Sequence, residues 1–308
     1  MPTIPKEYKL NTGASIPTVG LGTWQARAEN AVYEAVKTAL KAGYRHIDTA
    51  FLYGNEAEVG RGIRDGLKET GLTRQDIFVT TKLAPIHARP SHVGKAFAQS
   101  LASLDIGYVD LYLLHWPVAL NPATGQMFPL RPDGTRDLDT ELDGQFELTW
   151  QAMEQLVGDS LKAIGVCNFS IPNLDRLLKV AKIIPAVNQI ELHPYLPQFK
   201  LLDYCARHAI HVTAYSPLGS SNSPLLTDST LQRIADHHHV SVPQVMISWG
   251  ALRGSVIPKS VTPSRIESNF VLVDLTDDDV KAINEISNKH TQRIIRPPWG
   301  VPVFDEDF

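Results

Sequence analysis

The sequence predicts an α/β protein that folds as one (β/α)8 TIM barrel, with an N-terminal β-hairpin plug and long C-terminal loops. Short apolar runs rich in β-branched residues recur eight times, and each is followed by a loop and a longer stretch with helical periodicity. The length of 308 residues also suits this fold, which commonly takes about 250 residues in one domain. We therefore expect residues 1–308 to form a single barrel domain, and a doubly wound sheet is the alternative.

The eight apolar runs are the predicted strands of the barrel. They span residues 19–23, 46–50, 77–83, 109–115, 163–168, 187–192, 212–218 and 256–260. Amphipathic stretches between them predict helices, and examples are 29–42, 56–69, 91–104, 171–182, 227–239 and 243–252. We expect Ser91, which follows Pro90, to cap the third of these helices.

Three segments fall outside this repeat of strands and helices. Residues 8–16 have turn residues in their middle and predict a hairpin that plugs the barrel floor. Residues 119–145, rich in Pro, Gly and Asp, and residues 293–308 predict long loops on the face where the strands end. Long loops on a rigid scaffold often carry function, so we expect both to border the functional site.

Composition and charge restrict the class of protein. Hydrophobic residues make up 43% of the chain and charged residues 20%, which is typical of a globular protein with a large core. The net charge of −4 provides no basic field for nucleic acid. No run approaches the about 18 apolar residues of a membrane span, the chain starts without an apolar leader, and Cys167 and Cys205 form no disulfide framework. We expect a cytoplasmic protein with no nucleic-acid or membrane partner.

Polar residues gather where the predicted strands end, which is the active face of a barrel. Asp48 and Tyr53 follow the second strand, Lys82 ends the third and His115 ends the fourth. The later strands add four more polar side chains, Asn168, Gln189, Tyr215 and Ser216. An acid, a phenol, a lysine and a histidine are thus expected at one mouth.

Six stretches of the chain carry a specific resemblance to a known family. They are GYRHIDTA at 43–50, LHWP at 114–117, GVCNF at 165–169, NQIE at 188–191, AYSPLG at 214–219 and IPKSVTP at 257–263. In this order they resemble the markers of the aldo-keto reductase family, in particular its aldose and aldehyde reductases. The resemblance runs from the N-terminal hairpin to the last residue.

The four polar residues have a chemical logic that agrees with the roles this family implies. A carbonyl that accepts hydride develops alkoxide charge, so a positioned acid must deliver a proton, and Tyr53 is the candidate. We expect the ammonium of Lys82 to lower the pKa of Tyr53 by about 1–3 units. Asp48 would hold Lys82 in place, and His115 would orient the carbonyl oxygen.

The resemblance also implies NADPH as the cofactor and no metal. The expected cofactor-binding residues are Thr23, Trp24, Asp48, Asn168, Gln189, Tyr215, Ser216, Leu218, Ser220, Lys259, Ser260, Val261, Thr262, Arg265 and Asn269. The amides of Asn168 and Gln189 suit a nicotinamide carboxamide, and the basic, hydroxyl-rich residues from 259 to 265 suit a phosphate group at a helix start. The expected substrate-binding residues are Trp24, Tyr53, His115, Trp116 and Trp299.

Several positions depart from the family pattern, among them Cys167 and the pair Gln25 and Asn222 at the cofactor site. Cys167 stands where relatives usually have a serine, which weakens one expected hydrogen bond to the carboxamide. Gln25 and Asn222 stand where relatives usually close a loop over the cofactor with a lysine–aspartate ion pair. A neutral amide pair holds such a loop closed less strongly than an ion pair does, so we call it a weak latch and expect faster release of NADP⁺ than in those relatives.

These observations predict a monomeric enzyme that reduces small polar aldehydes, such as glyceraldehyde, aldoses or uronates, to alcohols in a reversible reaction with NADPH. One alternative is a cofactor-sensing binding or regulatory subunit with little turnover. Another is a barrel glycosidase, for which Asp48 and Glu191 are the nearest pair of carboxylates.

Three further patterns are interpreted as structural. Gly60, Gly62 and Gly66 lie within a helical pattern and follow no strand, so they are no dinucleotide fingerprint. Tyr33 and Lys37 lie on a surface helix. Residues 237–239 are three successive histidines, which diverge on a helix and cannot converge on one metal ion.

Overall fold

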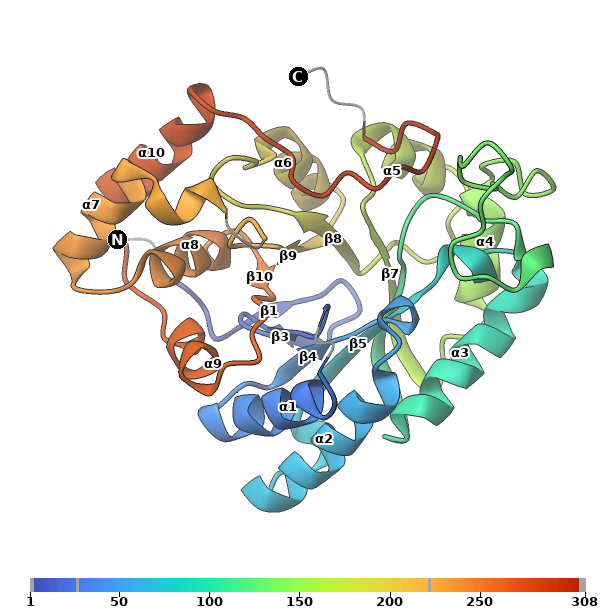
Figure 1. Cartoon of the computed structure of the whole chain (residues 1–308), viewed down its shortest axis with the longest axis horizontal. Helices are drawn as coiled ribbons and strands as arrows, with labels where there is room; N and C mark the ends of the chain where they lie inside the picture. Colours follow the sequence, from blue (N-terminus) through green and yellow to red (C-terminus); the bar gives the residue numbers. More distant parts are fainter. Residues whose placement is uncertain (1–2, 26–27, 221–222, 305–308) are drawn as a thin grey trace.

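Eight parallel strands form the centre of the molecule in this computed structural model, which describes residues 3–25, 28–220 and 223–304. The strands are β3 (Leu21–Gly22), β4 (His46–Asp48), β5 (Phe78–Leu83), β6 (Val109–Leu114), β7 (Leu161–Cys167), β8 (Val187–Glu191), β9 (His211–Tyr215) and β10 (Ser255–Val256). Each is hydrogen-bonded to its neighbour in the chain, and the helices surround them (Figure 1). The predicted (β/α)8 barrel is confirmed, and the doubly wound alternative is wrong.

Backbone hydrogen bonds between the first and last strands close the barrel. Gly20 N donates to Val256 O at 2.8 Å, Val256 N donates to Thr18 O at 2.8 Å, and Gly22 N donates to Pro258 O at 3.0 Å. Gly22 permits this approach, because a Cβ atom there would lie 2.9 Å from the carbonyl oxygen of Ile257. The closed ring brings all the strand ends to one mouth.

Amphipathic helices cover the outside of the barrel. They are α1 (Ala31–Ala42), α2 (Glu56–Thr70), α3 (Pro90–Leu104), α4 (Phe146–Glu154), α5 (Ile171–Leu178), α6 (Phe199–Arg207), α7 (Ser229–His238), α8 (Val242–Ala251), α9 (Pro263–Phe270) and α10 (Asp277–Asn284). The predicted helices are confirmed, but the expected Ser91 cap is wrong: α3 begins one residue earlier, with Arg89 as N-cap and Pro90 as the first helical residue. Proline is favourable at that position because its missing N–H is not needed there.

The glycines of α2 allow close helix packing. A Cβ atom on Gly60 would lie 1.9 Å from the carbonyl oxygen of Leu104 in α3, and one on Gly62 would lie 2.9 Å from the carbonyl oxygen of Tyr33 in α1. The glycine pattern therefore serves packing, as the sequence indicated.

An N-terminal hairpin plugs the closed end of the barrel, as predicted. Its strands β1 (Glu7–Lys9) and β2 (Ser15–Pro17) pair antiparallel, with Tyr8 opposite Ile16. Ile16 packs into the barrel interior with residues of β5, β6 and β8, and the Tyr8 hydroxyl donates to the carbonyl oxygen of Ala251. The opposite mouth is left for the functional site.

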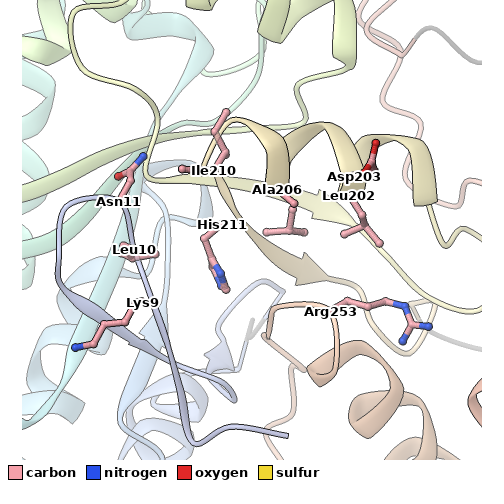
Figure 2. A pocket seen from close by; sticks show the side chains of 11 residues that line it. Lys9, Leu10, Asn11, Leu202, Asp203, Ala206, Ile210, His211 and Arg253 are labelled. Carbon is pink, nitrogen blue, oxygen red and sulfur yellow. The ribbon is translucent and has the colours of Figure 1, made fainter. Parts of the chain in front are cut away.

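A cavity of about 630 Å³ lies at this closed end, between the hairpin, α6 and the start of β9 (Figure 2). Two of its lining side chains are engaged elsewhere: His211 Nε2 lies 2.9 Å from Ser255 Oγ, and Arg253 donates to Asn284 Oδ1 at 2.6 Å. His211 begins β9 and Tyr215 ends it, so the cavity is at the end of the strand away from the mouth. His211 and Arg253 therefore make their hydrogen bonds within the barrel floor.

Two long segments border the mouth, as expected. Residues 119–145 contain only a short 3₁₀ turn (Pro122–Thr124) and isolated bridges, and Arg89 fastens them through two hydrogen bonds to Asp139, at 2.6 and 3.0 Å. Residues 293–304 follow the last helical turn without forming a helix or strand. Within the described parts of the chain, no helix is long and apolar enough to cross a membrane.

Candidate active site

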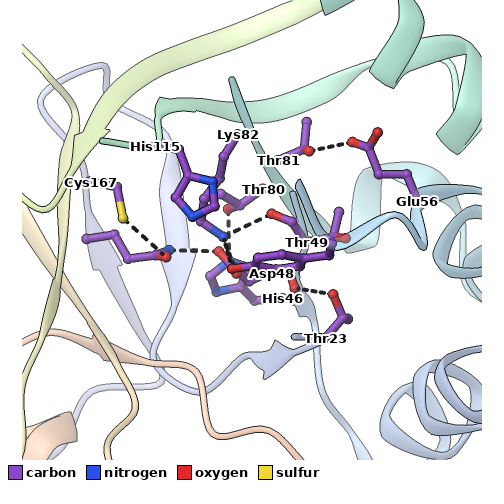
Figure 3. A network of polar contacts seen from close by, with 12 residues as sticks. Thr23, His46, Asp48, Thr49, Glu56, Thr80, Thr81, Lys82, His115 and Cys167 are labelled. Carbon is purple, nitrogen blue, oxygen red and sulfur yellow. Dashed lines mark hydrogen bonds and ion pairs between the residues drawn. The ribbon is translucent and has the colours of Figure 1, made fainter. Parts of the chain in front are cut away.

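Three consecutive strands bring the four predicted catalytic residues together at the mouth. Asp48 ends β4, and Tyr53 follows in a 3₁₀ turn (Phe51–Tyr53). Lys82 lies near the end of β5, and His115 comes directly after β6. The carboxyl ends of parallel strands meet at one edge, so residues far apart in sequence become neighbours (Figure 3).

Lys82 is the centre of the cluster. Its side chain is fully buried, and its ammonium donates to Asp48 Oδ1 at 2.6 Å, to the carbonyl oxygen of Thr49 at 2.9 Å and to the Tyr53 hydroxyl at 3.2 Å. A lysine ammonium has three N–H groups, so all three are used. Burial disfavours the charge, but the Asp48 carboxylate and the neighbouring Tyr53 and Cys167 together outweigh burial and raise the pKa of Lys82.

The pKa of Tyr53 differs from the sequence-based expectation. Burial raises it to about 12, and the ammonium of Lys82 offsets only part of that rise. The expected fall in the pKa is therefore wrong, because the sequence does not reveal how deeply the phenol is enclosed. The Tyr53 phenol is therefore protonated at physiological pH, and the cation beside it would favour the phenolate if the proton left.

His115 lies beside the phenol as a neutral imidazole. The ring centroids of Tyr53 and His115 are 5.8 Å apart, with an angle of 74° between the rings. Burial and the charge of Lys82 lower the pKa of His115 well below its usual range. Among the described residues, no hydrogen-bond partner lies within reach of its buried Nδ1 atom. A neutral ring can donate one hydrogen bond and accept one.

Two amide side chains contact the cluster. Gln189 lies in β8, and Asn168 directly follows β7. Gln189 Nε2 donates to Asp48 Oδ2 at 2.7 Å, so both oxygens of this carboxylate have a partner. Asn168 Nδ2 donates to the carbonyl oxygen of His115 at 3.0 Å, and its Oδ1 accepts from the Tyr215 hydroxyl at 2.6 Å. The expected carboxamide-binding residues therefore lie next to the four polar residues.

Cys167 lies in the same group of side chains. Its sulfur is 3.2 Å from Asn168 Nδ2 and 3.9 Å from Gln189 Oε1. Burial raises the pKa of this thiol, so it is neutral and forms only weak hydrogen bonds.

The remaining expected cofactor residues extend from the mouth across β9, β10 and α9. Thr23 Oγ1 donates to the carbonyl oxygen of Asp48 at 3.0 Å, while Ser216 and Ser220 have left-handed backbone conformations, with φ angles of 47° and 67°. The loop with Leu218 follows β9, and Asn269 is buried in α9.

The polar residues after β10 precede α9 and are partly exposed. Thr262 N donates to Ser260 Oγ at 3.1 Å, while Lys259, Val261 and Arg265 are exposed. Lys259, Ser260 and Thr262 thus precede α9, and Arg265 lies in its first turn, so the basic and hydroxyl-rich residues gather at a helix start as the sequence indicated. Lys259 Nζ also lies 3.4 Å from the carbonyl oxygen of Gln25, whereas Asn222 is outside the described residues.

Aromatic rings gather on one side of the mouth, where the sequence predicts substrate binding. The ring of Trp24, which is 43% exposed, lies 4.8 Å from that of Tyr53. Trp116 and Trp299 pack edge to face at 5.2 Å, which brings the C-terminal segment against the residue that follows His115. The expected substrate residues therefore lie around the phenol and the imidazole.

Two further aromatic residues, Phe128 and Phe304, join this group of rings and were not expected from the sequence. Phe128 lies 6.4 Å from the ring of Trp299, and Phe304 lies 6.1 Å from that of Trp116. Both belong to the long segments expected to border the site. Aromatic residues in such segments were the signal that could have identified them.

Two other expectations concern carboxylates and metals. Asp48 is bound to Lys82 and Gln189, and Glu191 is bound to residues 193, 294 and 295, so the glycosidase alternative has no free pair of carboxylates. In residues 3–25, 28–220 and 223–304, no group of three or more His, Cys, Asp and Glu side chains could hold a metal ion. His238, at the end of α7, pairs instead with Asp279 at 2.8 Å.

The fold and site define a class of protein: a (β/α)8 barrel that holds a neutral phenol between a buried ammonium and a neutral imidazole at its mouth. The profile of the Aldo/keto reductase family matches residues 18–288. The chain therefore belongs to the aldo/keto reductase family, as its sequence motifs indicated.

Relatives match over nearly the whole chain. A glycerol 2-dehydrogenase (NADP(+)) of Saccharomyces cerevisiae is 47% identical over 96% of this chain and 95% of its own. A D-galacturonate reductase of Hypocrea jecorina is 44% identical over 97% of both chains. The solved structure of an aldose reductase from Giardia lamblia is 42% identical, with a TM-score of 0.88 over 94% of this chain and 98% of that chain.

Proposed function

We propose that this protein is an NADP(H)-dependent oxidoreductase that reduces small polar aldehydes, such as glyceraldehyde, aldoses and uronates, to alcohols in a reversible reaction. One observation carries the proposal: the Lys82 ammonium lies 3.2 Å from the Tyr53 hydroxyl and 2.6 Å from Asp48 Oδ1. This arrangement presents a protonated phenol whose conjugate base is stabilised by a fixed positive charge.

The residues of the mouth supply the proton in this reaction, and NADPH, when bound, supplies the hydride to the carbonyl carbon. Tyr53 donates its proton to the carbonyl oxygen as negative charge develops there. Lys82 stabilises the phenolate that remains, and Asp48 keeps Lys82 charged and in place. His115, as a neutral imidazole, holds the carbonyl oxygen toward the phenol.

The donor set at the mouth fits NADPH. Asn168 and Gln189 offer amide donors and acceptors for a carboxamide, and Tyr215 offers a ring on which nicotinamide could stack. Lys259 and Arg265 supply cations for a 2′-phosphate, and Ser260 and Thr262 supply hydroxyl donors. The relative named as an NADP(+)-dependent dehydrogenase supports this choice of cofactor.

Small polar aldehydes fit the rest of the site. Trp24, Trp116 and Trp299 give aromatic walls, while Tyr53 and His115 give the polar contacts at the reacting carbonyl. The names of the relatives that act on glycerol and on galacturonate support a substrate with several hydroxyl groups.

A panel of aldehydes and sugars, each tested with NADPH and NADH, examines the reaction class, the cofactor and the substrate size together. We expect glyceraldehyde, aldoses and uronates to be reduced with NADPH. Cofactor binding without turnover of any carbonyl would instead support the cofactor-sensing subunit, which the complete set of Tyr53, Lys82 and His115 disfavours.

We also propose that the protein works as a cytoplasmic monomer. Cys167 and Cys205 are both free and buried, which suits a reducing compartment. The four proposed catalytic residues come from one chain, so the chemistry needs no second copy. Light scattering of the purified protein and fluorescence microscopy of a tagged copy would test these two statements.

A further inference from the structure

Glu191 is a buried carboxylate that the proposed chemistry does not use. It ends β8, and its side chain is fully buried. Its Oε1 accepts from the backbone N–H of Ile294 at 2.7 Å and lies 2.9 Å from His193 Nε2, while its Oε2 accepts from the backbone N–H of Ile295 at 2.9 Å. A residue at the end of β8 thus binds two consecutive residues of the C-terminal segment, Ile294 and Ile295.

The charge of this carboxylate is also maintained. Arg293 Nη1 lies 3.7 Å from Glu191 Oε2. Although burial opposes ionisation, the contact with His193 and the backbone N–H groups outweigh it and lower the pKa of Glu191. Hydrogen bonds to an ionised acceptor are stronger than those to a neutral one.

The gripped segment carries part of the substrate wall. In Figure 1 it runs, in red, from α10 past α6 toward α5, where Asn173 Nδ2 donates to the carbonyl oxygen of Val303 at 3.5 Å. Between these points, Ile295 and Trp299 join the apolar cluster around Trp116. The segment is thus fixed at one end by Glu191 and packs near His115 through its aromatic residues.

Strand β8 connects this fastening to the catalytic centre. Gln189 and Glu191 are two residues apart, so their side chains point to the same face of the strand, about 7 Å apart along it. Gln189 holds Asp48, and Glu191 holds the C-terminal segment. One rigid strand therefore sets the position of the segment relative to the proposed reacting groups.

We propose that Glu191 is a positioning residue for substrate: it fixes residues 293–304 at the mouth so that Trp299 confines the aldehyde beside Tyr53 and His115. This inference rests on the proposed reductase function. It assigns to Glu191 an effect on substrate binding that is separate from cofactor binding and from proton transfer.

The chain offers a matched control in Glu154. This buried carboxylate at the end of α4 also accepts from two consecutive backbone N–H groups, those of Lys182 and Ile183, at 2.7 and 2.8 Å. It holds the connection between α5 and β8 and lies among none of the residues of the mouth. Removing either carboxylate leaves two backbone donors unpaired, but only Glu191 holds the C-terminal segment.

The experiment compares Glu191→Ala and Glu154→Ala with the wild type by steady-state kinetics with glyceraldehyde, NADPH titration and amide hydrogen exchange. For Glu191→Ala we expect KM for glyceraldehyde to rise about tenfold, with a smaller change in kcat and no change in the Kd of NADPH. Exchange at residues 294–304 should accelerate. Glu154→Ala should lower Tm but leave KM and the exchange of that segment unchanged.

A milder variant and the wild type keep the test decisive if Glu191→Ala does not fold. Glu191→Gln retains one acceptor oxygen and should give an intermediate rise in KM. In the wild type, the amides of Ile294 and Ile295 should exchange far more slowly than exposed amides, and unprotected amides there would overturn the proposal.

Three other results would overturn it: an unchanged KM in folded Glu191→Ala, an equal rise in the Kd of NADPH, or the same kinetic effect in Glu154→Ala. Absence of any reductase activity in the wild type would contradict the proposed function instead. The hydrogen exchange would still report whether Glu191 fastens the segment.

Discussion

Gln189 Nε2 donates to Asp48 Oδ2 at 2.7 Å, while Lys82 binds the other oxygen of the same carboxylate at 2.6 Å. Asp48 is therefore held from two strands and cannot rotate without losing one of these bonds. This fixed carboxylate orients the ammonium that faces Tyr53. The proposed acid thus depends on residues from β4, β5 and β8, which supports a set of specific predictions.

Tyr53→Phe should abolish aldehyde reduction and leave NADPH binding intact. The substitution removes the proton donor and little else, and loss of a positioned acid typically costs about 100-fold or more in kcat. Steady-state kinetics and a fluorescence titration with NADPH would measure both effects. If the variant kept most of its kcat, the proton donor would be His115 or a water molecule instead of Tyr53.

Lys82→Met should lose activity and also destabilise the fold. It leaves Asp48 as a buried, unpaired carboxylate, which typically costs about 3–5 kcal/mol in the free energy of unfolding. The double variant Lys82→Met/Asp48→Asn should recover much of that stability but none of the activity. Urea unfolding of the single and double variants would check this, and equal stabilities would contradict the ion-pair argument.

The pH profile of kcat/KM should lack an inflection near the ordinary pKa of histidine. The pKa of His115 is lowered well below its usual range, so the ring stays neutral as the pH falls through 6.5. The pKa of Tyr53 is raised to about 12, so the phenol remains a competent donor as the pH rises toward that value. Rates measured between roughly pH 6 and 9 should therefore be nearly constant, and a half-maximal point within this range would contradict the assignment.

The enzyme should prefer NADPH to NADH, and Arg265→Ala should reduce that preference. Arg265 and Lys259 are exposed cations beside the start of α9, where charge-assisted hydrogen bonds to a 2′-phosphate are worth about 1.5–3 kcal/mol each. The ratio of kcat/KM for the two cofactors measures this discrimination. If Arg265→Ala left the ratio of kcat/KM for NADPH and NADH unchanged, Arg265 would not bind the 2′-phosphate.

The double variant Gln25→Lys/Asn222→Asp should release NADP⁺ more slowly than the wild type. It would replace a neutral amide pair with an ion pair across the cofactor, and opening of such loops often limits turnover. Stopped-flow measurement of NADP⁺ release would check the prediction. The single variants serve as controls, because neither one creates an ion pair, and equal release rates in all forms would refute the weak-latch argument.

The fold could be predicted because its signals are local. The eight strands and the six helices named from the sequence each left a periodicity of their own, and the eightfold alternation predicted the barrel. The positions of Asp48, Lys82 and His115 followed from the same logic, because parallel strands bring their carboxyl ends together.

The features that the sequence did not reveal depend on long-range contacts. The pKa of Tyr53 rises because the assembled mouth encloses the phenol, and no property of residues 46–53 alone reports that burial. The backbone N–H groups that Glu191 binds lie about one hundred residues further along the chain, so its contact with the C-terminal segment left no local pattern. The wrong Ser91 cap is a local error, because proline and serine compete for the start of the same helix.

The four proposed catalytic residues all lie between residues 48 and 115, whereas the segment with Trp299 comes from the far end of the chain. The proposed catalytic residues and the C-terminal part of the proposed substrate wall therefore occupy separate stretches of the gene. Under the proposed function, recombination or drift in the last codons would change which aldehydes are accepted and leave the proposed proton donor unaltered. In this architecture, new substrate ranges can evolve without rebuilding the reaction.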